Sequence, residues 1–317
     1  MQMDALRVGA TAAPEAPADQ EAPGRLLWAT ELLPAVAPQP GAQGGDPAAG
    51  AGLPTGMASL DSLLGGLWPG LYLLEGPPGI GKSTLALQIA LSAARVAPVL
   101  YVTFENSPAD LALRWVASRS RIPLSDLRQG TADAAAVGRV IADSAAEAAR
   151  LAFIPGNISL TVAALHAAAR AALRRHEARR CLMVVDSLPV WAAHGVDVAH
   201  CASSADRAEA LAILLRELGA ALDSPVLGVA AQEMRERESE RVSTRLTTPE
   251  AVSVSGGLDA VADAVLILTE ARTRGEKPPA RAIDLVVAKN RRGPSGRVEC
   301  VFRPDLALVR ESMLQRH

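Results

Sequence analysis

Aromatic residues are scarce in this chain, at 3% of 317 residues, and it has only three cysteines. Cys181, Cys201 and Cys300 are an odd number at unrelated spacings, which predicts neither a disulfide framework nor a zinc site. No apolar stretch approaches the ~20 residues that span a bilayer. The N-terminus also lacks a basic segment followed by an apolar one. These absences favour a cytoplasmic protein without a membrane partner.

An excess of charge of one sign is also missing. The chain has 32 basic (Lys and Arg) and 34 acidic residues, which gives a net charge of −2. No global basic field therefore attracts nucleic acid, and any such contact must come from a local patch. Hydrophobic residues reach 49%, which is enough for one full α/β core with chain to spare.

The first 53 residues are rich in Ala, Pro, Gly and Gln and contain almost no β-branched residues. We expect them to form a disordered tail, because they cannot bury enough apolar surface to order themselves. One short amphipathic segment, 25–33, lies between two prolines within this tail. It is either a fragment that lies on its own domain or a short helix that docks on a neighbouring subunit.

From residue 54 to 311, strand-like and helix-like segments alternate, and 312–317 form a short tail. This alternation predicts one α/β domain with a mostly parallel central sheet flanked by helices. The expected strands are 71–75, 99–104, 151–154, 181–186, 226–231 and 264–268. The expected helices are 84–96, 108–118, 162–176 and 205–222. Two later strands, 282–289 and 297–302, predict a C-terminal β-hairpin with a long tip.

The most specific motif is GPPGIGKS at 76–83, a complete G-x-x-x-x-G-K-[ST] phosphate loop between an apolar strand and a helical segment. A plain glycine turn is the alternative, and the Lys-Ser pair argues against it. We expect backbone N–H groups and the helix N-terminus to bind the phosphates of ATP. Lys82 would reach the β- and γ-phosphates, and Ser83 would ligate Mg²⁺. The predicted nucleotide-binding residues are Gly76, Pro77, Pro78, Gly79, Ile80, Gly81, Lys82, Ser83 and Thr84.

Three polar residues follow apolar strands. Asp186 has the position of a Walker B acid that holds Mg²⁺, although an Asp there could instead cap a turn before Ser187. Glu105 could orient and deprotonate the attacking water, or it could belong to the N-cap region of the helix that follows. Gln232 could sense the γ-phosphate, or it could be a plain polar strand end.

These motifs resemble RecA-type P-loop ATPases, and most closely the ATPase domain of DnaB-type replicative helicases. The matching stretches lie between residues 53 and 310, and include VLYVTFENSPADLALRWVASRSRI, SVSGGLDAVADAVLIL and VVAKNRRGPSGRVECVF. The resemblance implies that Glu105 is the catalytic base and that Lys289 and Arg291 reach the nucleotide of a neighbouring subunit. It implies a homo-oligomeric ring, expected to be a hexamer. For the two hairpin cations, the alternative is a solvated basic tip.

The phosphate loop EGPPGIGKS and the segment VVDSLP look more like bacterial RadA and KaiC-type relatives. DnaB helicases also carry a helical N-terminal domain that engages primase, and the tail here is too short and too poor in apolar residues to form one. We therefore do not expect coupling to primase. The leading interpretation is an ATP-dependent DNA helicase or translocase. The alternatives are a RadA- or KaiC-like recombination or regulatory ATPase that does not unwind DNA, and a loader that uses nucleotide as a switch.

Single-stranded DNA is the expected partner, and two segments are candidates for contacting it at the centre of a ring. One is 191–204, which follows Asp186, and the other is 233–255, which follows Gln232. The second segment interleaves Arg with Glu in its first half, a pattern that is also typical of a solvated, salt-bridged helix. Its later half is rich in hydroxyl groups, which could follow a phosphate backbone together with backbone amides.

Overall fold

The computed structural model describes residues 52–230, 257–271 and 276–312. Gln232, the candidate DNA-contacting segment 233–255 and the amphipathic segment 25–33 lie outside these residues. The first described residues already belong to the folded part of the chain. Leu53 is buried and forms a β-bridge with Leu67, with backbone hydrogen bonds of 2.8 and 2.7 Å.

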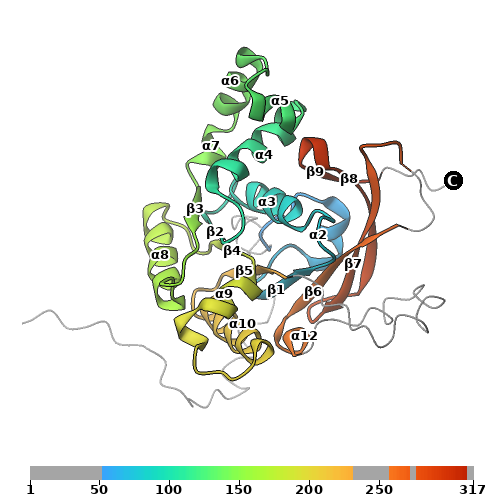
Figure 1. The fold of residues 1–317 in the computed structure, drawn as a ribbon. Coiled ribbons are helices and arrows are strands. Elements are labelled where there is room, and N and C mark those ends of the chain that lie inside the picture. The colour runs from blue at the N-terminus through green and yellow to red at the C-terminus, as the bar shows by residue number, and fades with distance from the viewer. Residues whose placement is uncertain (1–51, 231–256, 272–275, 313–317) are drawn as a thin grey trace, which may run out of the picture. The chain divides into compact units, whose positions relative to one another are not determined.

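A single mixed sheet organises the described residues (Figure 1). Its nine strands have the order β3-β2-β4-β5-β1-β6-β7-β8-β9. The first six strands of this order pair in parallel, and the pairs from β6 to β9 are antiparallel. The bounds are β1 Gly70–Glu75, β2 Val99–Thr103, β3 Leu151–Pro155, β4 Leu182–Asp186, β5 Pro225–Val229, β6 Ala264–Glu270, β7 Arg281–Asn290, β8 Gly296–Arg303 and β9 Leu308–Glu311. The predicted α/β class and the C-terminal hairpin are confirmed, and β9 is an additional strand.

The four expected helices are present as α3, α4, α8 and α10. Side-chain caps explain where three of them begin, because Ser107, Thr161 and Ser203 each accept a hydrogen bond from a backbone N–H of the first turn. The helices that the sequence pattern did not predict are short. The bounds are α2 Ala58–Leu64, α3 Lys82–Ala93, α4 Pro108–Ser120, α5 Leu124–Gln129, α6 Ala134–Asp143, α7 Ala145–Ala148, α8 Val162–Arg175, α9 Leu188–His194, α10 Ser204–Ala221 and α12 Leu258–Val261, with 3₁₀ turns η2 Val196–Val198 and η4 Pro304–Leu306.

Two apolar cores cover the two faces of the sheet. Along β1 the side chains alternate, so that Tyr72 and Leu74 face the core that contains α3, while Leu71 and Leu73 face the core that contains α8 and α10. All six residues of β1 are buried. A strand covered by helices on both sides reads as a continuous apolar run rather than an alternating one, and this is why the sequence pattern located the parallel strands well.

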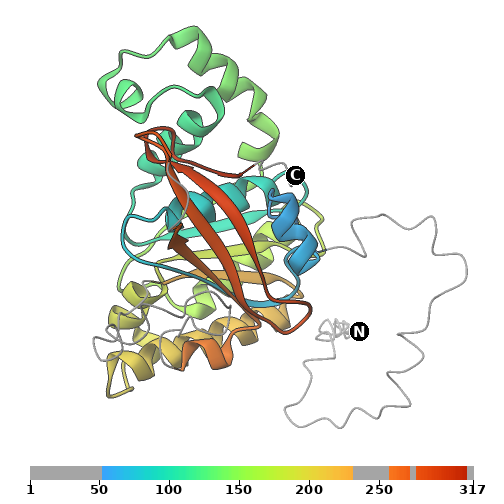
Figure 2. The same cartoon turned by 90° about the vertical axis from the view of Figure 1, so that its right-hand side faces the viewer.

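The antiparallel end of the sheet packs against α3, the helix that follows the phosphate loop. Gln88 on α3 donates from Nε2 to the carbonyl of Val309 at 2.8 Å, and its Oε1 accepts the Val309 N–H at 2.6 Å. In Figure 2 the strands β7, β8 and β9, coloured orange to red, lie at the front of the view. This packing brings the turn after β8 next to the beginning of α3.

The candidate DNA-contacting segment 191–204 is largely folded rather than an open loop. It contains the end of α9 and η2, and α9 packs against α10. Trp191 is 1% exposed, and its indole N–H donates to the carbonyl of Leu160 at 3.1 Å. Trp191 therefore serves the core, whereas Val196 in the same segment is 57% exposed. Among the described helices, none combines the length and the apolar character that crossing a membrane would require.

Candidate nucleotide-binding site

The phosphate loop joins the end of β1 to the first residue of α3. All three of its glycines have backbone conformations that other residues rarely adopt, among them Gly76 with φ of 148° and Gly81 with φ of 110°. A Cβ on Gly76 would lie 2.6 Å from the carbonyl oxygen of Leu268 on β6. Gly81 occupies the N-cap position of α3, where the helix presents its positive dipole end. The local sequence thus builds an anion-binding turn held close against the sheet.

A pocket of about 640 Å³ opens beside this loop, at the C-terminal ends of the parallel strands. Its volume lies within the usual range for small-molecule sites. Of the predicted site residues, Pro78, Gly79, Gly81, Lys82, Ser83, Thr84, Glu105 and Asp186 line it. Gly76, Pro77 and Ile80 do not. Ile80 is 2% exposed and anchors the loop in the core instead.

Lys82 begins α3 and turns back over the loop. Its Nζ donates to the carbonyls of Gly76 at 2.8 Å and Pro77 at 3.0 Å. Burial lowers the pKa of Lys82, and the nearby carboxylates of Glu105 and Asp186 counteract this. The ammonium group is therefore held at the pocket wall by weak neutral acceptors, which a more negative acceptor such as a phosphate oxygen can replace.

Asp186 is the last residue of β4, and it is 1% exposed. The hydroxyl of Tyr101 donates to its Oδ2 at 2.8 Å. Burial raises the pKa of Asp186, and hydrogen bonds from Tyr101 and Ser83 oppose this increase. The hydroxyl of Ser83 and the carboxylate of Asp186 are hard oxygen donors in direct contact, which is the donor set that suits Mg²⁺.

We predict that Tyr101→Phe moves the acidic limb of the pH–rate profile for Mg²⁺-dependent nucleotide hydrolysis to higher pH. The hydroxyl favours the ionised form of Asp186, so its loss raises the Asp186 pKa further, and protonation then removes the predicted metal ligand at a higher pH. The profile of kcat/KM against pH measures this shift. Tyr72→Phe is the matched control, because the Tyr72 hydroxyl accepts the Trp68 N–H away from the pocket. Identical acidic limbs in both variants would contradict the prediction.

Glu105 lies just after β2, and hydrogen bonds fix both its side chain and the backbone turn that contains it. The hydroxyl of Ser187 donates to Glu105 Oε1 at 2.7 Å. The Thr103 hydroxyl donates to the carbonyl of Asn106 at 2.7 Å and accepts the Asn106 N–H at 3.3 Å. Arg114 Nη2 donates to Asn106 Oδ1 at 2.8 Å. Glu105 therefore faces the pocket on a turn that is fixed by its neighbours on both sides.

The capping role considered for the region of Glu105 falls to another residue. Ser107 is the N-cap of α4, and its hydroxyl accepts the Asp110 N–H at 3.0 Å. The hydroxyl also donates to Asp110 Oδ2 at 2.7 Å. Glu105 takes no part in this cap, which leaves its carboxylate among the residues that line the pocket.

The two hairpin cations do not line this pocket. β7 runs antiparallel to β6, and its last residue Asn290 pairs with Ala264, the first residue of β6. The phosphate loop instead follows the last residue of β1. The two groups thus lie at opposite ends of parallel strands, one strand length apart, or roughly 20 Å for six residues. We call the end of the sheet at which the parallel strands finish the C-terminal edge, and the end at which they begin the N-terminal edge. Neither term refers to the outermost strands β3 and β9.

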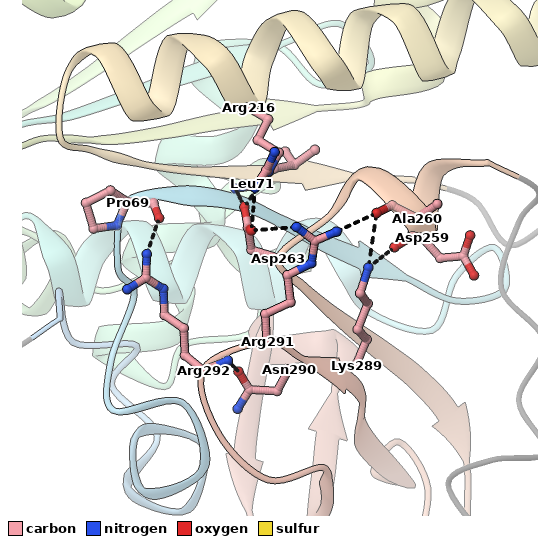
Figure 3. Close-up of polar contacts among 10 residues, drawn as sticks. All are labelled: Pro69, Leu71, Arg216, Asp259, Ala260, Asp263, Lys289, Asn290, Arg291 and Arg292. Carbon is pink, nitrogen blue, oxygen red and sulfur yellow. Dashed lines mark hydrogen bonds and ion pairs between the residues drawn. The ribbon is translucent and has the colours of Figure 1, made fainter. Parts of the chain in front are cut away.

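At the N-terminal edge, both cations are hydrogen-bonded to backbone carbonyls of α12 (Figure 3). Lys289 Nζ donates to the carbonyl of Asp259 and, at 3.2 Å, to that of Ala260. Arg291 Nη2 donates to the carbonyl of Ala260 at 2.8 Å. The Arg291 side chain is nevertheless 44% exposed, so part of its guanidinium still faces outward.

Several residues of the pocket were not predicted from the sequence. Asn106 and Ser187 each follow a predicted site acid directly, and their position could have identified them. Arg114 on α4 and Phe302 on β8 carry no such local signal, because only the tertiary fold brings their elements to the phosphate loop. Phe302 lies 3.3 Å from where a Cβ on Gly81 would be, so it forms an apolar wall beside the loop.

Comparisons with known proteins agree with this architecture. The family model for the DnaB-like helicase C-terminal domain matches residues 52–311. A replicative DNA helicase DnaB from Leifsonia xyli subsp. xyli is 28% identical over 263 residues, which cover 80% of this chain and 54% of that protein. The chain thus spans about half the length of that curated relative.

Two further similarities are more limited. A DNA repair protein RadA from Aquifex aeolicus is 53% identical over only 62 residues, or 19% of this chain and 14% of that protein. The solved ATPase domain of G40P has a TM-score of 0.69 at 18% identity, over 82% of this chain and 91% of that one. At this identity the likeness supports the fold alone.

Proposed function

The chain belongs to the DnaB-like helicase C-terminal domain family, and from this premise we propose that it is a ring-forming ATPase that acts as a DNA helicase or translocase. The observation that carries the proposal is the placement of the nucleotide pocket and of the Lys289/Arg291 pair on opposite edges of one sheet. A subunit arranged in this way needs a neighbour to complete its site.

We infer a division of roles among the residues of one pocket. Lys82 and the backbone N–H groups of the phosphate loop hold the phosphates of ATP, and Ser83 with Asp186 holds Mg²⁺. The metal, when bound, would neutralise charge on the β- and γ-phosphates. Glu105 orients the attacking water and accepts its proton. The apolar wall at Phe302 suits the nucleotide base.

The remaining charge stabilisation comes from a second subunit. In a cyclic head-to-tail assembly, the N-terminal edge of each subunit faces the pocket of the next one. Arg291 would then stabilise negative charge on the transferring phosphoryl group in trans, with Lys289 beside it. We expect this ring to be a hexamer formed by residues 54–311.

Single-stranded DNA is the proposed partner of the ring. The candidate segment 191–204 buries Trp191 and Val198 but leaves most of its other residues exposed. The proposal assigns the DNA contact to this segment and to segment 233–255, with Gln232 relaying the state of the nucleotide to the second one. Contacts to phosphates dominate such binding, so we expect the affinity to fall steeply with salt.

A RadA-like recombination or regulatory ATPase is the second candidate, supported by the 53% identity over 62 residues. The two functions predict different products from a forked duplex. For the helicase, we predict that single-stranded DNA stimulates ATP hydrolysis and that the fork is unwound only with a hydrolysable nucleotide. A Lys82→Ala variant is the control, because it retains the surface but lacks the phosphate-binding ammonium. Stimulated hydrolysis without strand displacement would favour a RadA-like recombination ATPase. Slow turnover that DNA does not stimulate would contradict the helicase and favour a regulatory ATPase or a loader.

A further inference from the structure

Asp263 immediately precedes β6 and connects three elements at the N-terminal edge (Figure 3). Its Oδ2 accepts the backbone N–H of Leu71 at 3.0 Å and Arg216 Nε at 3.0 Å, and its Oδ1 accepts Arg216 Nη2 at 3.1 Å. The bidentate pair with Arg216 fixes the plane of the carboxylate. Oδ1 also lies 3.5 Å from Nη1 of Arg291. The same carboxylate therefore ties α10, the start of β1 and the hairpin together.

Both the backbone and the guanidinium of Arg291 contact the segment just before β6. Its backbone N–H donates to the carbonyl of Asp263 at 2.9 Å, while its guanidinium contacts the Asp263 carboxylate and the Ala260 carbonyl. Burial alone would raise the pKa of Asp263. The hydrogen bonds from Arg216 and the Leu71 N–H outweigh burial and lower this pKa, so the carboxylate stays charged. A guanidinium has five N–H groups, and these two contacts leave others directed away from Asp263.

The position of the Asp263 carboxylate depends on a glycine at the start of β1. Gly70 has φ of 136°, and a Cβ there would lie 2.4 Å from Asp263 Oδ2. The carboxylate thus lies directly against the backbone at the start of β1. A hollow of about 360 Å³, lined by Gly70, Arg216, Asp263 and Arg292 among others, opens beside it. The edge therefore leaves room for an approaching group while the carboxylate itself stays fixed.

We propose that Asp263 is a positioning residue that acts through Arg291, holding its guanidinium at the N-terminal edge in the position from which it meets the nucleotide of the neighbouring subunit. This inference rests on the proposed function of Arg291. A flexible arginine would have to be ordered at each catalytic cycle, whereas one held at both ends is ordered beforehand. Arg216 contributes to the same positioning indirectly, because its two hydrogen bonds prevent the Asp263 carboxylate from rotating.

The test is subunit mixing with full-length chains. We predict that Asp263→Asn lowers kcat for ATP about tenfold while KM stays within about twofold, because an interaction specific to the transition state is lost. Mixing this variant 1:1 with Lys82→Ala should restore activity. The Lys82→Ala subunit has an impaired pocket but an intact Asp263 and Arg291. With random mixing and independent sites, about a quarter of all protomers would combine a working pocket with a working neighbour.

The same mixture made with Arg291→Ala tests the proposed function separately. If mixing restores Arg291→Ala but not Asp263→Asn, Asp263 affects the pocket of its own subunit rather than that of the neighbour. The inference is then wrong, while the proposed function stands. If neither is restored, Arg291 does not act in trans and both fail. A wild-type kcat for Asp263→Asn would also overturn the inference.

Two controls separate positioning from loss of folding. Asp223→Asn breaks the exposed Asp223–Arg180 ion pair, whose atoms are 3.1 Å apart, without touching Arg291. It should keep the wild-type kcat. Should Asp263→Asn lower the midpoint of thermal unfolding, Arg216→Gln replaces it, because this variant keeps the Asp263 contacts to Leu71 and Arg291. A smaller fall in kcat that mixing restores supports the inference, and an unchanged kcat contradicts it.

Discussion

Arg291→Ala should reduce the steady-state rate of ATP hydrolysis by about 10³–10⁵-fold, the range found for arginines supplied in trans to phosphate-loop enzymes. The guanidinium stabilises charge that develops on the transferring phosphoryl group, and water cannot replace it inside a closed interface. Affinity for ATP should change far less than the rate, because the charge that Arg291 stabilises develops in the transition state and not in the bound nucleotide. Phosphate release at saturating ATP measures the rate, and a fluorescent nucleotide measures the binding.

Arg297→Ala is the matched control for this prediction. Arg297 lies on β8 of the same hairpin, its side chain is 47% exposed against 44% for Arg291, and it pairs with Asp284 at 3.7 Å. Its removal lowers the positive charge of the hairpin equally, but it should leave hydrolysis near the wild-type rate. A wild-type rate for Arg291→Ala would remove the case for a shared site, as would a lone subunit that hydrolyses ATP at the full rate.

Much of the pocket could be predicted from the sequence because parallel strands deliver their last residues to one edge. Glu105 follows β2 and Asp186 ends β4, and these strands pair directly, with Thr103 opposite Asp186. Once the phosphate loop was placed at the end of β1, the pocket followed from the topology. The continuous apolar runs of the buried strands made those ends visible in the sequence.

Other features depend on contacts between distant segments. The location of Arg291 follows from the pairing of β7 with β6, which contains a register shift between Val265 and Leu266. No local pattern reveals that shift or the contact between Asp263 and Arg216. The helices α5, α6 and α7 bury no residue fully. The helices α5 and α7 are too short to show a periodic apolar pattern, whereas the amphipathic pattern of α6 was present in the sequence and was missed. Trp191 could be read as a loop residue because its partners, the ring of Phe104 and the carbonyl of Leu160, come from distant segments.

Glu105→Gln should lower hydrolysis by about 10²–10⁴-fold, the usual contribution of a general base, while ATP and Mg²⁺ still bind. The amide has the same shape as the carboxylate and can still accept the hydrogen bond that Ser187 donates at 2.7 Å, so the turn should keep its structure. What is lost is the ability to take a proton from water. Glu147→Gln is the control, because Glu147 pairs with Arg119 on a surface away from the pocket.

Glu105→Gln and Arg291→Ala should both lower hydrolysis, but they remove groups at opposite edges of the sheet. A Glu105→Gln subunit has an inactive pocket but offers an intact Arg291, whereas an Arg291→Ala subunit offers the reverse. Mixed rings should therefore hydrolyse ATP faster than either variant alone, since some interfaces join a working pocket to a working arginine. Measured as phosphate release against the mixing ratio, the rate should pass through a maximum near equal amounts. A straight line between the two pure variants would mean that each subunit hydrolyses ATP with its own residues.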